Sequence, residues 1–170
     1  MLELYVMRHA KSSWDNLQLP DHDRPLSDRG KRNAKKICEF FVKKQIKFDL
    51  VLVSSSIRTK KTLKILQKKL EKPKKIITSK SLYLANENKI ALKIKKIKKH
   101  YKKVLLINHE PAVTNLVNYL VKNKENSLFK LMNYKFPTAA FAKIVFDLDN
   151  WSKINDRTGL LKNFIRPKDI

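Results

Sequence analysis

Two arginines and two histidines of this 170-residue sequence are candidates for binding and transferring a phosphoryl group. They are Arg8, His9, Arg58 and His109. A guanidinium group is planar and permanently charged, and it matches two phosphate oxygens at once. A neutral imidazole beside a bound phosphoryl group can attack it as a nucleophile, and a protonated one can stabilise the charge of the transferring group. These residues therefore predict phosphoryl chemistry, provided that the fold brings them to one place.

The elements that must position them are short apolar runs that alternate with amphipathic segments. The apolar runs cover 2–7, 50–53, 76–78, 104–107 and 139–146. Apolar residues recur at helical spacing after Pro25 and Ser27, over 57–70, over 89–103 and after Pro111. Buried strands that alternate with amphipathic helices are typical of a mostly parallel sheet covered on both faces. We therefore expect a three-layer α/β/α fold in a single domain over 1–170.

The predicted strands place the candidate residues at one edge of the sheet. Arg8 and His9 follow the first run, Arg58 comes shortly after the second, and His109 comes shortly after the run 104–107. Ligands of open α/β sheets bind outside the carboxyl ends of the strands. Two of the predicted helices also start there, and their N-terminal N–H groups and dipoles favour an anion.

The motifs around these residues carry a family resemblance. Residues 7–14 read Met-Arg-His-Ala-Lys-Ser-Ser-Trp, and residues 23–30 read Asp-Arg-Pro-Leu-Ser-Asp-Arg-Gly. The pattern continues through Ser54, Arg58, Thr62, Leu82-Tyr83, His109, Pro111, Pro137-Thr138, Trp151 and Arg166-Pro167-Lys168. Over nearly its whole length the chain resembles the SixA-type phosphohistidine phosphatases of the histidine phosphatase (phosphoglycerate-mutase-like) superfamily. The resemblance implies a phosphoglycerate-mutase-like fold.

The resemblance also implies roles for individual residues. It makes His9 the nucleophile that becomes phosphorylated, and it makes Arg8 and Arg58 ligands of the phosphoryl oxygens. It implies that His109 completes the pocket and that Arg24 approaches the phosphate. It implies neither a metal ion nor an organic cofactor.

The chain departs from the family pattern at two places. Asn108-His109-Glu110-Pro111 stands where the family often has Gly-His-Asn-Pro, and Thr59 and Lys61 replace the more usual Ala and Gln. A carboxylate beside an anion site weakens anion binding if it points inward. We expect Glu110 to point outward.

A general acid is hard to find in the sequence. Larger members of the superfamily carry one in the stretch that corresponds to 79–88, where this chain offers only Glu87. An alkoxide leaving group needs a proton, because the pKa of its alcohol is near that of water, roughly 15.7. An imidazole already protonated on its other nitrogen leaves neutral, with a conjugate acid of about 6.5. Phosphohistidine therefore needs Glu87 far less than a phosphomonoester does.

The length of the chain supports the same substrate. Few residues remain for a lid once the strands and helices are assigned, so we expect a shallow pocket that a protein side chain can enter. The predicted function is a metal-independent phosphatase that hydrolyses phosphohistidine on a signalling or phosphotransfer protein through a phospho-His9 intermediate. The alternatives are a phosphatase of small phosphomonoesters and a non-catalytic basic binding module.

Several classes of protein are excluded by the composition. Gly30 and Gly159 are the only glycines, so no Gly-rich phosphate loop exists. Cys38 is the only cysteine, and Lys44 stands where a Cys-x5-Arg phosphatase would need arginine. The N-terminal segment contains no run long enough for a signal peptide or a membrane span. A cytoplasmic protein with no membrane partner is therefore expected.

The net charge of +24 comes from 39 basic residues, most of them lysines spread through almost every segment. A compositional background explains such a distribution, so a nucleic acid partner is not expected, although 89–103 is dense in lysine. Asp21, His22 and Asp23 are consecutive and are expected to form a loop turn rather than a metal site. Trp14 is expected near the site, either packed at the edge of the core or stacked on a substrate.

Overall fold

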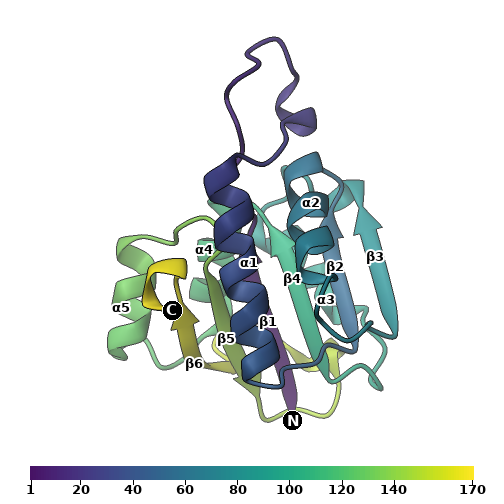
Figure 1. The fold of residues 1–170 in the computed structure, drawn as a ribbon. Coiled ribbons are helices and arrows are strands. Elements are labelled where there is room, and N and C mark those ends of the chain that lie inside the picture. Colours follow the sequence, from purple (N-terminus) through teal and green to yellow (C-terminus); the bar gives the residue numbers. More distant parts are fainter.

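The computed structural model describes residues 1–170 and has one six-stranded sheet with helices on both faces (Figure 1). The strands are β1 (Leu2–Arg8), β2 (Leu50–Ser54), β3 (Lys75–Ser79), β4 (Lys103–Asn108), β5 (Phe141–Phe146) and β6 (Gly159–Ile165). The helices are α1 (Asp28–Lys43), α2 (Ile57–Leu66), α3 (Glu87–Lys95), α4 (Ala112–Leu120) and α5 (Ser127–Tyr134). Short 3₁₀ turns complete the chain, among them η1 (Asp21–Asp23). No helix is both long and apolar enough to cross a membrane.

The sheet is mostly parallel, as the sequence predicts. Its strand order is β3-β2-β4-β1-β5-β6. The four strands from β3 to β1 are parallel to one another. Strand β5 is antiparallel to β1, and β6 is antiparallel to β5. The carboxyl ends of β1, β2 and β4 therefore lie at one edge, below the long loop at the top of Figure 1.

The side chains of each strand point alternately to the two faces of the sheet, and this divides the core into two layers. On β1, Leu4 and Val6 face a cluster of 30 buried residues under α3, α4 and α5. Tyr5 and Met7 face a cluster of 17 buried residues under α1 and α2. Successive side chains of a strand point to opposite faces, so one buried strand supplies both layers. The predicted three-layer α/β/α fold is confirmed.

The structure corrects the predicted extents of several elements. The helix expected over 89–103 ends at Lys95, because lysines three and four apart repel each other along the rest of that run. Helix α2 ends at Leu66 rather than at residue 70. Helix α5 and strand β6 were not predicted. In β6 the polar pair Lys162-Asn163 interrupts the apolar pattern, and this edge strand is buried on only part of its length.

The loop between β1 and α1 is fixed at its base. Ser27 is the N-cap of α1 as predicted, since its Oγ accepts a hydrogen bond from the Gly30 N–H. The N–H and the hydroxyl of Ser27 both donate to the Lys11 carbonyl. A Cβ atom at position 30 would overlap that carbonyl, so glycine is required there. This contact holds the residues that directly follow His9 against the start of α1.

Candidate active site

The four residues predicted for phosphoryl chemistry meet at the carboxyl edge of the sheet. Arg8 ends β1 and pairs in register with Asn108, the last residue of β4, so the residues that follow these strands are neighbours. The ring centroids of His9 and His109 are 5.2 Å apart. Arg58 lies in the first turn of α2, beside them. A cavity of about 230 Å³ is lined by Arg8, His9, Lys11, Ser12, Trp14, Arg24, Arg58, His109, Glu110 and Thr138.

Hydrogen bonding fixes the tautomer of His9. Its Nδ1 lies 2.7 Å from the carbonyl oxygen of Ala10. A carbonyl oxygen only accepts, so Nδ1 carries the proton and Nε2 keeps its lone pair. The Ala10 N–H in turn donates to Thr62 Oγ1 on α2, which holds this segment in place. The imidazole is thus oriented for attack through Nε2.

Burial keeps both imidazoles uncharged. Desolvation lowers the pKa of His9 to about 3, and the nearby charges of Arg58 and Arg8 act in the same direction. Desolvation and the Arg58 charge lower the pKa of His109 to about 4. At neutral pH His9 is therefore an unprotonated nucleophile. His109 is neutral in the empty cavity, and a bound phosphoryl dianion would raise its pKa and favour the imidazolium.

The same shifts predict how stability depends on pH. The unfolded chain binds protons at these histidines near pH 6.5, whereas the folded chain binds them only near pH 3 to 4, so the free energy of unfolding falls as pH drops below about 6.5. We expect urea unfolding to show a loss on the order of 4 kcal/mol between pH 7 and pH 5, about half of it from each histidine. The variant His9→Gln should show a smaller loss, and His100→Gln on the surface should match the wild type. Equal pH slopes in all three proteins would contradict this expectation.

Two buried polar groups of the cavity have no hydrogen-bond partner. They are Nε of Arg8 and Nδ1 of His109. The Nη1 of Arg8 donates to the Phe136 carbonyl, which fixes the guanidinium plane. Buried polar groups without partners are rare and costly in folded proteins. Both groups can therefore donate to the oxygens of an anion that enters the cavity.

Asp21 holds Arg58 in position. The two Nη atoms of Arg58 donate to the Asp21 carbonyl oxygen at 2.7 Å and to its Oδ2 at 3.0 Å. Tyr83 also donates its hydroxyl to Oδ2, at 2.6 Å. The bond from Tyr83 and then Arg58 lower the pKa of Asp21 to about 2, so it is ionised. The loop turn predicted at Asp21 is present as η1. The sequence did not predict the contact of Asp21 with Arg58. The only sequence signal for it is a carboxylate three residues before Arg24.

Arg24 is buried beneath Trp14. Its guanidinium carbon lies 3.2 Å from the centre of the Trp14 ring, and its Nη2 donates to Ser12 Oγ at 2.6 Å. The indole remains 60% exposed and forms the outer wall over this arginine. Stacking of an arginine on an aromatic face supplies cation–π attraction. Trp14 thus packs on a residue of the site rather than on the core.

The two candidate carboxylates lie differently from what the sequence predicts. Glu87 is the first residue of α3, where a carboxylate complements the helix dipole, and it does not line the cavity. Glu110, expected to point outward, lines the cavity instead. It is held there because its carboxylate accepts hydrogen bonds from the N–H and hydroxyl of Thr114 in the first turn of α4.

Comparison with known proteins finds a matching family model. Residues 4–83, a little under half of the chain, match the model of the histidine phosphatase superfamily, branch 1. The matched segment contains Arg8, His9, Arg24 and Arg58, and it is similar to that superfamily.

Individual relatives resemble the chain to different extents. An uncharacterized chloroplastic protein of Arabidopsis thaliana is 45% identical over 64 residues, which are 38% of this chain and only 29% of the plant protein. Among solved structures, a protein described as SixA from Nakamurella multipartitia has a TM-score of 0.85 at 21% identity, with 98% of this chain and 96% of that chain covered. A SixA structure complexed with tungstate has a TM-score of 0.82 at 20% identity, with 99% of both chains covered. The fold of the chain is therefore that of the SixA structures.

Proposed function

We propose that this chain is a metal-independent phosphatase that hydrolyses phosphohistidine on a signalling or phosphotransfer protein. The observation that carries the proposal is the state of His9, which is neutral, has Nε2 free and is flanked by arginines in a cavity of about 230 Å³. The likeness to a SixA structure described as a tungstate complex supports an oxyanion ligand at this edge of the sheet. Arg8, Arg24 and Arg58 are the proposed ligands of the phosphoryl oxygens, and His109 is the second catalytic imidazole.

In the first step the lone pair on Nε2 of His9 attacks phosphorus. A bond forms between Nε2 and phosphorus while the bond from phosphorus to the substrate nitrogen breaks. The departing imidazole takes the electron pair of that bond, and it leaves neutral because its other nitrogen already carries a proton. Nδ1 of His9 keeps its proton, which the Ala10 carbonyl accepts throughout. The three guanidinium groups and a protonated His109 balance the phosphoryl charge.

In the second step water attacks the phosphorus of phospho-His9. The bond from phosphorus to Nε2 breaks, its electron pair returns to the ring, and the protons of the water leave with inorganic phosphate or pass to solvent. His9 is restored as the neutral tautomer that the site favours by burial. Neither step requires a metal ion or a carboxylic acid, and Glu110, the carboxylate residue that lines the cavity, is bonded to Thr114.

A paired assay tests this function. A protein domain that carries phosphohistidine is compared with p-nitrophenyl phosphate and 3-phosphoglycerate, at equal enzyme concentration and without added metal. We expect the phosphohistidine protein to be dephosphorylated at least about 100-fold faster in kcat/KM than 3-phosphoglycerate, whose alkoxide leaving group needs a proton. The leaving group of p-nitrophenyl phosphate needs no proton, so this ester reports on the phosphoryl cavity alone. Faster hydrolysis of 3-phosphoglycerate would overturn the proposal and would point to Glu110 or Glu87 as a proton donor.

A further inference from the structure

A groove lined by lysines runs between α1 and α2, next to the phosphoryl cavity. Its volume is about 630 Å³, and its lining consists of Pro25, Leu26, Lys31, Lys35, Lys61, Lys64, Ile65 and Lys68. The two helices pack side by side on the same face of the sheet (Figure 1). The five lysines therefore face one shared hollow, with Leu26 and Ile65 as its apolar part.

The positive charge of this groove is almost uncompensated. Lys31 approaches one carboxylate, Asp28, at 3.9 Å, and that carboxylate is 90% exposed. The other lysines of the groove form no ion pair, and no acidic residue lines it. Lysines without an acidic partner also occur elsewhere on the chain. The groove differs from them because five lysines line one hollow that has no carboxylate in its lining.

The spacing of these lysines adds repulsion along each helix. Lys31 and Lys35 are four residues apart on α1, and Lys61 and Lys64 are three residues apart on α2. Like charges at these spacings destabilise a helix. An anionic occupant would remove the repulsion within each helix and between the two helices.

The groove and the phosphoryl cavity are lined by neighbouring residues of the chain. Arg24 lines the cavity, and the next two residues of the chain, Pro25 and Leu26, line the groove. A protein with a phosphorylated side chain in the cavity can therefore extend a neighbouring segment to the groove. Specificity for that molecule can be supplied by contacts outside the cavity, which is small and binds mainly the phosphoryl group.

We infer that this groove is a docking site for an acidic segment of the phosphohistidine-bearing protein, an inference that rests on the proposed function. The carboxylates of the segment pair with the lysines, and its short apolar side chains cover Leu26 and Ile65. The lining favours a protein over a nucleic acid, because it offers no aromatic ring on which a base can stack and no arginine fork for a base edge.

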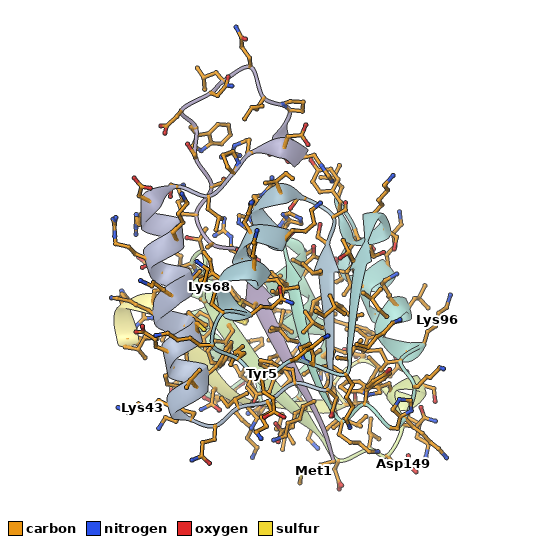
Figure 2. All side chains as sticks on the ribbon, turned by 45° about the vertical axis from the view of Figure 1, so that its right-hand side comes forward. Met1, Tyr5, Lys43, Lys68, Lys96 and Asp149 are labelled. Carbon is orange, nitrogen blue, oxygen red and sulfur yellow. The ribbon has the colours of Figure 1, made fainter.

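Two peptides that differ only in charge test the inference. Both contain one phosphohistidine joined to a flanking tract, which is rich in Glu in one peptide and has Gln at the same positions in the other. The groove variant is K61Q/K64Q/K68Q. The matched control is K96Q/K98Q/K99Q, which removes the same charge from exposed lysines at and beyond the end of α3. Figure 2 shows Lys68 and Lys96 on opposite sides of the molecule.

The wild type should prefer the acidic peptide about tenfold in kcat/KM, through a lower KM that rises with salt. The groove variant should lose this preference and keep its rate on the Gln peptide, while the control should keep both. The melting temperature of the groove variant should equal or exceed that of the wild type, because repulsion is removed. Equal peptide preference in the groove variant and the wild type would overturn the inference.

Failure of the proposed function would be recognised separately. If the wild type hydrolyses neither peptide, phosphohistidine is not its substrate. Docking is then measured by fluorescence anisotropy of the labelled, unphosphorylated Glu peptide on the wild type, the groove variant and the control. Weaker binding to the groove variant alone supports the groove. Tighter, groove-dependent binding of a labelled single-stranded DNA oligonucleotide in the same titration contradicts the assignment to an acidic protein.

Discussion

The variant His9→Ala is expected to lose phosphohistidine phosphatase activity by a factor of about 10⁴ or more in kcat. The loss follows because Nε2 of His9 is the group that carries the phosphoryl between the two steps, and no other side chain of the cavity has a free nucleophilic atom in the same place. Rapid-quench assays with labelled substrate should also trap a phosphoenzyme in the wild type. The label should be labile to acid and stable to alkali, as a phosphoramidate is, and it should be absent from the variant.

Two further variants serve as controls for the result with His9→Ala. His100→Ala removes an exposed imidazole away from the cavity and should leave the activity unchanged. His109→Ala should lose activity but still accumulate labelled enzyme, since the nucleophile is present. Labelling of His9→Ala at the wild-type level would show that the covalent intermediate forms elsewhere.

The variant Arg58→Ala is expected to lose about 10³-fold in kcat/KM. Its guanidinium is buried, is held by two bonds to Asp21 and faces the cavity with Arg8 and His109. Removal of one such charged donor from a preorganised site costs about 10²–10³ in rate. The alanine variant also leaves the Asp21 carboxylate near the cavity with only its longer contact to Arg24, at 3.4 Å, so its charge is less compensated and repels an incoming phosphate.

Inhibition by inorganic phosphate provides the second measurement for this variant. The inhibition constant should rise by a similar order, because phosphate binds through the same guanidinium. Arg58→Lys should recover only part of the activity, since an ammonium group is a compact charge without the planar fork of donors that can bond Asp21 and a phosphate at once. Arg32→Ala, an exposed position on α1, is the control and should behave as wild type. A kcat/KM of Arg58→Ala within threefold of the wild-type value would show that Arg58 is not part of the site.

The sequence predicts the layers and the convergence of the site well, for a physical reason. Strands β1, β2 and β4 are buried on both faces, so each is a nearly continuous apolar run, broken in β1 only by Glu3, that ends at a polar residue. Their parallel arrangement then determines which residues meet. For this reason the sequence predicts that Arg8, His9 and His109 lie together.

Features that depend on loops and edges were predicted poorly. The bonds from Asp21 to Arg58 and Tyr83 join residues far apart in the sequence, and no periodic pattern records such a contact. The orientation of Glu110 depends on local hydrogen bonds from the N–H and the hydroxyl of Thr114, for which water is an alternative donor. Strand β6 lies at the edge of the sheet, where polar residues are tolerated and the apolar pattern is weak.

The tip of the loop between β1 and α1 is a site where a longer segment can be engineered into the chain. The base of this loop is clamped by the Ser12–Leu26 bridge and by the contact of Lys11 with Ser27, while Leu17 near its tip is 82% exposed (Figure 1). Added residues at an exposed tip cost little closure entropy, and the clamped base isolates them from the nucleophile. The tip is therefore the place to graft a longer segment that encloses a small metabolite. A change of substrate class would then require new loop length rather than new catalytic residues.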